Sequence, residues 1–82
     1  MKVKEFLTEK NWVNHTPLNS DEACLVTAID RCYPEPYNFR ICKLIKDRLK
    51  LGGFGITTPV AEWNDSMESF EPIKAIIEEL GI

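Results

Sequence analysis

The sequence predicts an all-α fold, a small bundle of about four helices with a longer glycine-containing loop over residues 52–68. Apolar residues recur at helical spacing in four stretches, and proline or glycine separates most of these stretches. The length of 82 residues allows one small domain over 1–82, because a chain this short hides only roughly 60–65% of its unfolded surface. Helices with apolar faces and short connections pack as a bundle.

The first predicted helix covers residues 3–10. Its apolar face holds Val3, Phe6 and Leu7, which are spaced i, i+3 and i+4. Asn11 ends this pattern, and we expect Trp12 and Val13 to fold back onto the helix.

Polar residues indicate where the second helix begins. Asn19 is followed three residues later by Glu22, which is typical of a capping box. The expected apolar face holds Cys24, Leu25, Ala28, Ile29 and Cys32. Pro34 and Pro36 then end the helix, because proline removes a backbone donor and favours extended backbone.

The third predicted helix runs from about Phe39 to Leu51. We expect Asn38 to cap its start and Gly52-Gly53 to end it. Arg48 falls on the apolar side, so it is expected either to snorkel to water or to pair with a carboxylate. That side holds Ile41, Cys42, Leu44, Ile45, Leu49 and Leu51.

The loop over 52–68 is the least regular part of the sequence. Thr58-Pro59 favours one helical turn over 59–63, and the alternative, a short strand over 54–57, has no visible partner strand. The run Gly52-Gly53-Phe54-Gly55 is rich in glycine, but no Gly-Lys-Ser/Thr follows it, which excludes a P-loop.

A last helix is expected over 70–80. Its apolar stripe is the most regular in the chain and consists of Ile73, Ile76, Ile77 and Leu80. We expect Ser66 or Ser69 to cap it, Pro72 to lie in its first turn and Gly81 to end it.

The number and spacing of the cysteines favour a cytoplasmic protein with reduced thiols. Cys24, Cys32 and Cys42 are odd in number, and with His15 they form no Cys-x2-Cys or His-x3-His pair. We therefore expect no metal and no cofactor. No apolar run reaches the roughly 18–20 residues that cross a bilayer, and the charged start Met1–Glu5 is unlike a signal peptide, so no membrane association is expected.

A small cysteine-dependent enzyme is a remote alternative. Cys24 lies near the start of the second helix, where the helix dipole lowers the pKa of a thiol. His15 together with Asn64 or Asp65 would complete a Cys-His-Asn arrangement. A core this thin hardly supplies a cleft with an oxyanion hole, so we expect the thiols to pack as small apolar groups and the protein not to be an enzyme.

Charge is segregated along the chain, although the net charge is only −3. Residues 40–50 carry a net charge of +4 and residues 61–82 carry −5. Lys43, Lys46 and Lys50 share one side of the third helix and are candidate nucleic-acid contacts. The favoured interpretation is a solvated face partly neutralised by Glu68, Glu71, Glu78 and Glu79.

Four aromatic residues in predicted turns and loops are candidates for binding another protein: Tyr33, Tyr37, Phe54 and Trp63. Aromatic side chains in loops usually cover a core, and tryptophan and tyrosine also dominate binding hot spots. A homodimer is compatible with the broad apolar side of the third helix.

Trp12, the stretch Cys24–Ile29 and the motif Trp63-Asn64-Asp65 form a wider pattern. It resembles an uncharacterised family of short bacterial, actinobacterial and phage proteins, with a tryptophan, a Cys-Leu-x-Gly-Ala-Ile-like helix and Trp-Asn-Asp. Thr27 stands where that family tends to have glycine. The resemblance implies a fold and a prokaryotic or phage origin, and it implies no reaction.

The Trp-Asn-Asp motif also has an interpretation from its residues alone. We expect Trp63 to anchor the loop to the core, and Asn64 and Asp65 to accept hydrogen bonds from nearby backbone amides. The alternative is a ligand site formed by the same polar pair. The sequence therefore predicts a small non-enzymatic interaction protein that binds and modulates another macromolecule, a host protein if the chain is phage-encoded, with a nucleic-acid-binding module as the alternative.

Overall fold

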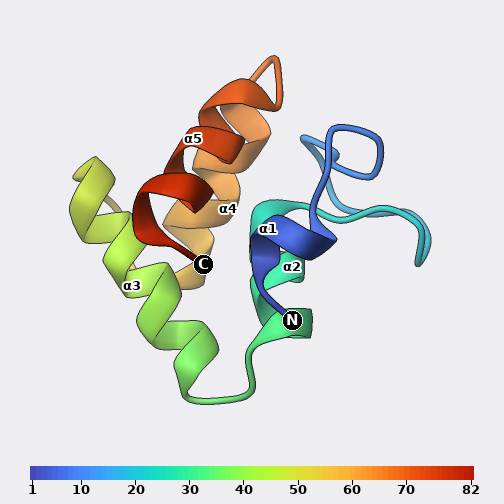
Figure 1. Cartoon of the computed structure of the whole chain (residues 1–82). Helices are drawn as coiled ribbons and strands as arrows, with labels where there is room; N and C mark the ends of the chain where they lie inside the picture. The colour runs from blue at the N-terminus through green and yellow to red at the C-terminus, as the bar shows by residue number, and fades with distance from the viewer.

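Five helices, rather than about four, make up the computed structural model, which describes residues 1–82 (Figure 1). The all-α prediction is confirmed: no strand forms, and the single β-type pairing is an isolated parallel bridge between Trp12 and Ala23. None of the helices combines the length and the apolar character that crossing a bilayer requires. In chain order they are α1 (Val3–Phe6), α2 (Leu25–Cys32), α3 (Tyr37–Leu49), α4 (Thr57–Ser66) and α5 (Glu71–Leu80).

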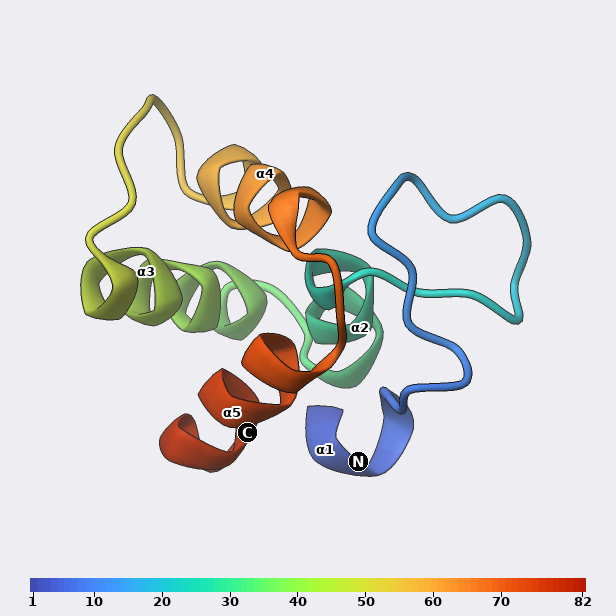
Figure 2. The ribbon, with the colours of Figure 1, turned by 90° about the horizontal axis from the view of Figure 1, so that it is seen from above.

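The helices surround one apolar core. α2 packs against α1, α3 and α4, while α3 also packs against α4, and α1 against α5. Seen from above, α3 and α4 lie side by side with the loop over 50–56 joining them at one end, and the segment between α1 and α2 extends on the opposite side (Figure 2). Each helix contributes buried apolar residues to the core, such as Val3, Leu25, Ile45, Val60 and Ile73.

α1 is shorter than the predicted helix over 3–10. It ends at Phe6 because the Asn11 side chain takes the place of the next helical turn. Asn11 Oδ1 accepts from the backbone amide of Thr8 at 2.7 Å, and Asn11 Nδ2 donates to the carbonyl of Phe6 at 2.8 Å. The backbone groups that would continue the helix are thus satisfied by a side chain.

The predicted capping box is not a helix start. Asn19 Oδ1 accepts from the amide of Asp21, and Glu22 Oε1 accepts from the amide of Leu18, both at 2.9 Å, so the two side chains close a local turn. α2 begins three residues after Glu22, with Cys24 as its N-cap.

α3 begins earlier than predicted, at Tyr37, and Pro36 is its N-cap. Asn38 is therefore not the cap. It lies inside the helix with a buried side chain, and its Nδ2 donates to Asp30 Oδ1 at 3.0 Å. This hydrogen bond joins α3 to α2.

α3 ends before the predicted Gly52-Gly53 stop. Lys50 adopts the left-handed region (φ 54°, ψ 45°), and its amide donates to the carbonyls of Asp47 and Lys46. The amide of Leu51 donates to the Lys46 carbonyl at 2.9 Å, which completes a Schellman motif. The reversal at Lys50 leaves Leu51 packed against the core, and this contact explains why the helix stops before the glycines.

A glycine at position 50 is expected to stabilise the fold. Lysine pays a steric penalty in the left-handed region that glycine does not, so Lys50→Gly should raise the free energy of unfolding by about 0.5–1 kcal/mol. Urea denaturation followed by circular dichroism measures it. Gly81→Ala is the reverse test, because it replaces a glycine that has a positive φ of 67° with a residue that is strained there, and it should lower the free energy of unfolding. Equal stability of all three proteins would refute this account of the helix ends.

α4 is the main element that the sequence conceals. It is a helix of 10 residues rather than one turn over 59–63 within an irregular loop. Its inward side carries Val60, Asn64 and Met67 at i, i+4 and i+7. Because a fully buried asparagine interrupts this stripe, the apolar periodicity fails to predict the helix.

α5 agrees closely with the predicted last helix. Pro72 lies in its first turn, and Gly81 ends it in the left-handed region. Neither Ser66 nor Ser69 caps it, since Phe70 is the N-cap and no side-chain cap bond forms. Ser66 instead ends α4, and its hydroxyl donates to the carbonyl of Trp63 at 2.7 Å.

Candidate functional site

The residues considered for thiol chemistry do not meet. His15 is exposed, and its Nδ1 lies 2.9 Å from the carbonyl of Thr16. Cys24 Sγ accepts from the amide of Thr27 at 3.4 Å and lies 3.2 Å from its hydroxyl oxygen. The Cys-His-Asn arrangement is therefore not formed, and no cluster of three or more His, Cys, Asp or Glu residues is placed to hold a metal ion.

Burial favours the protonated form of the other two thiols. Burial raises the pKa of Cys42 to about 11, with smaller contributions from Asp30 and Cys24 in the same direction. Burial also raises the pKa of Cys32. Since the thiolate is the nucleophile, these environments disfavour reaction near neutral pH.

Alkaline pH is expected to weaken the fold through Cys42. Its pKa rises from 9.0 to about 11 on folding, so between these values the unfolded chain binds fewer protons than the folded chain. The contribution of the buried Cys42 thiol to the free energy of unfolding is complete below pH 9 and is lost as the pH rises toward 11. The measurement is the difference in unfolding free energy between the protein and Cys42→Ala, which should shrink over this range. A constant difference would contradict the buried thiol.

Asn64 is the most connected side chain in the molecule. It is fully buried, and its Oδ1 accepts from Trp12 Nε1 at 2.7 Å and from the backbone amide of Leu25 at 3.0 Å. Its Nδ2 donates to the carbonyl of Val13 at 3.1 Å and to Asp65 Oδ1 at 3.0 Å. All four hydrogen-bonding positions of the amide are used.

These bonds have a structural role. Leu25 is the first residue of α2, whose early amides have no partner within the helix. Asn64 therefore caps α2 from α4 and fixes Trp12, whose ring packs 6.0 Å from that of Phe70. The expected backbone amide bond exists for Asn64, but it comes from a distant segment, and Asp65 accepts from Asn64 itself. The saturated amide leaves no free group for a ligand.

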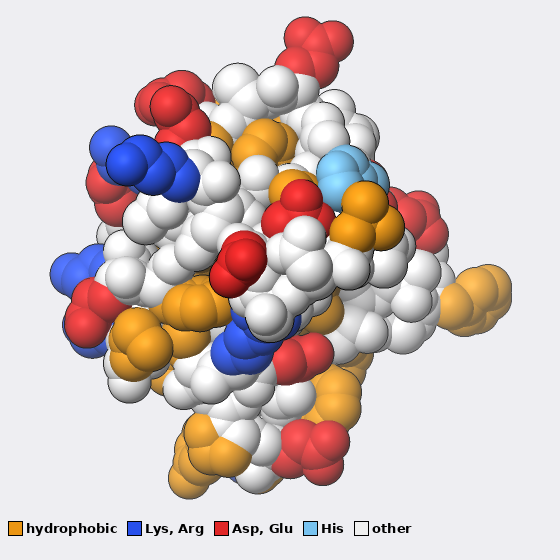
Figure 3. Space-filling view, turned by 90° about the vertical axis from the view of Figure 1, so that its right-hand side faces the viewer, with side chains coloured by type: hydrophobic (Ala, Val, Ile, Leu, Met, Phe, Trp, Pro, Cys, Tyr) orange, Lys and Arg blue, Asp and Glu red, His pale blue; other side chains and the backbone are white.

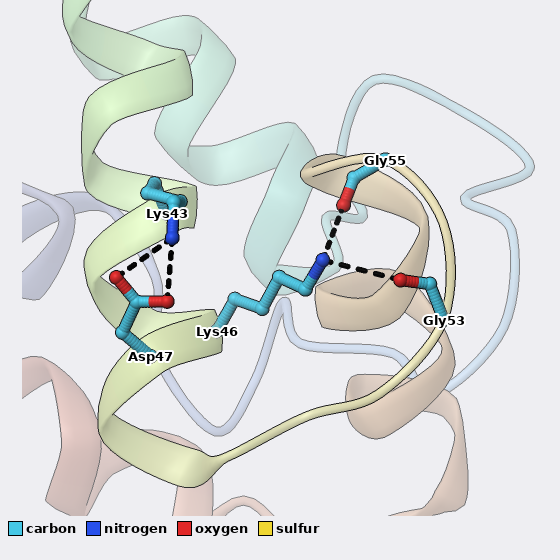
Figure 4. Close-up of polar contacts among 5 residues, drawn as sticks. All are labelled: Lys43, Lys46, Asp47, Gly53 and Gly55. Atoms are coloured by element: carbon cyan, nitrogen blue, oxygen red, sulfur yellow. Dashed lines mark hydrogen bonds and ion pairs between the residues drawn. The ribbon is translucent and has the colours of Figure 1, made fainter.

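The three candidate nucleic-acid lysines differ in their surroundings, and Figure 4 shows those of Lys43 and Lys46. Lys43 Nζ contacts both carboxylate oxygens of Asp47, at 2.7 and 2.9 Å. Lys46 Nζ donates to the carbonyls of Gly53 and Gly55, at 3.2 and 2.8 Å, and so ties the loop over 50–56 back to α3. Lys50 forms the helix end.

The acidic last helix neutralises only one cation of α3. Arg48 pairs with Glu79, with a 2.6 Å contact between Nε and Oε2 and a 2.8 Å hydrogen bond from Nη2 to Oε1. The expected carboxylate partner of Arg48 is thus confirmed. No ion pair joins Lys43, Lys46 or Lys50 to α5, so neutralisation by that helix is more limited than predicted.

The four candidate aromatic residues lie in different places. Tyr33 is half-buried, and its hydroxyl donates to the carbonyl of Ile82 at 3.1 Å. Trp63 packs against the core. Tyr37 is 53% exposed, and the guanidinium carbon of Arg40 lies 5.5 Å from the centre of the Tyr37 ring. Phe54, 98% exposed, lies between the two glycines whose carbonyls Lys46 holds.

A groove between α3 and the start of α4 gathers exposed apolar side chains. It has a volume of about 430 Å³. Phe39 is 39% exposed and Leu44 is 54% exposed, although both are large apolar residues. The groove is lined by Pro36, Phe39, Arg40, Lys43, Leu44 and Ile56.

The helix geometry and the Lys46 tether explain this groove. At about 100° per residue, Phe39 and Leu44 lie about 100° or more from Ile45, which faces the core. The two carbonyl bonds of Lys46 bring the 50–56 loop back over α3, and Ile56 at its end becomes the opposite wall. Gly53 and Gly55 allow this path because both have positive φ, 101° and 80°.

Two other depressions are smaller, and no exposed large apolar side chain lines them. One, of about 280 Å³ between α1 and α5, is lined by three apolar and six polar or charged residues. The other, of about 230 Å³, lies beside the Arg48–Glu79 pair. On the face that carries the segment between α1 and α2, apolar side chains form separate patches among acidic ones (Figure 3). The groove on α3 is therefore the candidate functional site.

Sequence reasoning identified Lys43 in this groove and missed the other lining residues. A signal exists for Phe39, a large apolar residue outside the predicted apolar side of α3. Leu44 was predicted on that apolar side, and this prediction is wrong, because its side chain is 54% exposed and lines the groove. Ile56 comes from another segment and gives no such signal. No family model, no curated protein and no solved structure matches the chain. The resemblance to short bacterial and phage proteins stays a prediction.

Proposed function

We propose that the protein is a small non-enzymatic interaction protein that binds another protein through the groove on α3. The observation that carries this proposal is the exposure of Phe39 and Leu44, which line the same groove. Exposed apolar residues gathered in one concave place are typical of interaction surfaces. Tyr37 and Phe54 are also exposed, and both belong to the stretch of chain from Pro36 to Ile56 that supplies the groove residues.

The groove favours a protein over a nucleic acid as the partner. One of the three candidate lysines, Lys46, is held by the carbonyls of Gly53 and Gly55, which reduces its availability for phosphates. The lining is mostly apolar, whereas phosphate binding relies on rows of free cations.

Site-specific photocrosslinking tests the proposal. The photoreactive amino acid benzoylphenylalanine replaces Leu44 in one variant and Leu18, a still more exposed leucine outside the groove, in the control. In extract from a bacterial host, the variant at position 44 should form a discrete protein adduct that nuclease treatment does not remove. No adduct at position 44, equal adducts at both positions, or an adduct that nuclease removes would overturn the proposal.

A further inference from the structure

The groove carries information on the chemistry of its partner. Along α3 the lining residues fall at Pro36, then Phe39 and Arg40, then Lys43 and Leu44. The nine residues from Pro36 to Leu44 span about 12 Å, since each of the eight steps between them rises about 1.5 Å. This length matches two turns of a partner helix that presents apolar residues at i, i+3 or i+4, and i+7.

Arg40 is a cation of the groove that has no carboxylate partner. Its guanidinium carbon lies 5.5 Å from the ring centre of Tyr37, and the exposed side chain forms no ion pair and no side-chain hydrogen bond within the protein. A guanidinium has five N–H donors in a planar fork that fits a carboxylate. An acidic side chain of a bound partner would meet these donors beside the apolar floor.

Lys43 is a second cation at the same wall. Its pair with Asp47 is exposed on both sides, 55% for the lysine and 60% for the aspartate. Exposed pairs of this type contribute little to stability, so Lys43 can exchange Asp47 for a carboxylate of the partner at small cost.

We propose that the groove takes an amphipathic helix of another protein whose apolar stripe is flanked by aspartate or glutamate. This inference rests on the proposed function and adds the partner's chemistry to it. A second copy of the chain fits less well. Its exposed Leu18 is followed by acidic residues, but that segment is a turn rather than a helix, and Glu22 is already bonded to the Leu18 amide.

Three synthetic helical peptides test this chemistry by fluorescence anisotropy with the full chain. The first has an apolar stripe flanked by glutamates, the second has lysines in place of the glutamates, and the third has the acidic composition with the stripe scrambled. We expect the acidic amphipathic peptide to bind at least about tenfold more tightly than either of the others. Its affinity should fall as salt is raised, because charge pairs at the rim are screened.

Charge reversal on the protein supplies the matched control. Arg40→Glu should weaken binding of the acidic peptide by about tenfold and strengthen binding of the basic one. Lys74→Glu makes the same charge change beside the α1–α5 depression and should leave both affinities unchanged. Circular dichroism confirms that both variants fold.

The outcomes separate this inference from the proposed function. Equal binding of acidic and basic peptides, or no effect of Arg40→Glu, overturns the acidic partner while a crosslink at position 44 still supports protein binding. Self-association in sedimentation velocity that Arg40→Glu abolishes would assign the groove to a second copy and overturn the inference. The absence of a crosslink at position 44 would overturn the proposed function itself.

Discussion

Asn64→Ala is expected to destabilise the fold by about 3–5 kcal/mol. The change removes the partners of Trp12 Nε1, the Leu25 amide and the Val13 carbonyl at once. Each buried polar group left without a partner costs about 1–3 kcal/mol. Chains of this size have total stabilities of roughly 4–12 kcal/mol, so this one amide carries a large share.

Chemical denaturation with matched variants measures this effect. Asn14→Ala removes an exposed asparagine that makes one bond, from its Nδ2 to the carbonyl of Met67 at 2.8 Å, and should cost less than about 1 kcal/mol. Trp12→Phe keeps an aromatic ring, although a smaller one, and removes one donor to Asn64, so an intermediate loss is expected. If Asn64→Ala lowered the free energy of unfolding as little as Asn14→Ala, the central role of the Asn64 amide would be refuted. If Asn64→Ala does not fold, the loss of stability in Trp12→Phe still tests the hydrogen bond between Trp12 and Asn64.

Leu44→Asp is expected to abolish partner binding without unfolding the protein. Leu44 is exposed, so its apolar contacts contribute little to the core, and a charge there should change the free energy of unfolding by less than about 1 kcal/mol. The same charge in the groove removes the apolar floor that a partner would cover, and affinity for the acidic amphipathic peptide should fall by more than about tenfold.

The neighbouring residue supplies the contrast. Ile45 is fully buried, so Ile45→Asp places a charge in the core and should unfold the chain. Circular dichroism and anisotropy on the two variants give opposite patterns if α3 has one structural and one binding side. Loss of fold in Leu44→Asp, or unchanged peptide binding, would contradict this division of the helix.

The parts of the fold that the sequence predicted are those with unbroken apolar stripes. α5 and the inward face of α2 follow from residues spaced i, i+3, i+4 and i+7, since burial of such a stripe determines a helix. The sequence did not predict the full length of α4, because Asn64 occupies a core position in this helix and a polar residue normally indicates the solvent side.

The helix ends were harder to predict because their partners are distant or unusual. The start of α2 is capped by a thiol, Cys24, and by Asn64 from 39 positions away. Asn19 and Asn38 have the right residue type for caps, but tertiary contacts and local turns use their side chains differently. Capping preferences are local, and here the folded chain supplies other acceptors.

The groove was only partly predictable for a similar reason. The basic side of α3 and the exposed aromatic residues Tyr37 and Phe54 could be identified from the sequence. Its opposite wall depends on Lys46, which was expected to be a free cation and instead holds the loop that carries Ile56. A side chain that organises a loop cannot be distinguished from a ligand-binding one by spacing alone.

A titration of isotope-labelled protein with the acidic amphipathic peptide, followed by amide chemical shifts, tests the binding groove most directly. The groove predicts that the shifts concentrate in residues 36–44 and 53–56, with little change in α1 and α5. Shifts centred on the depression between α1 and α5, or spread evenly over the basic residues up to Lys50, would contradict it.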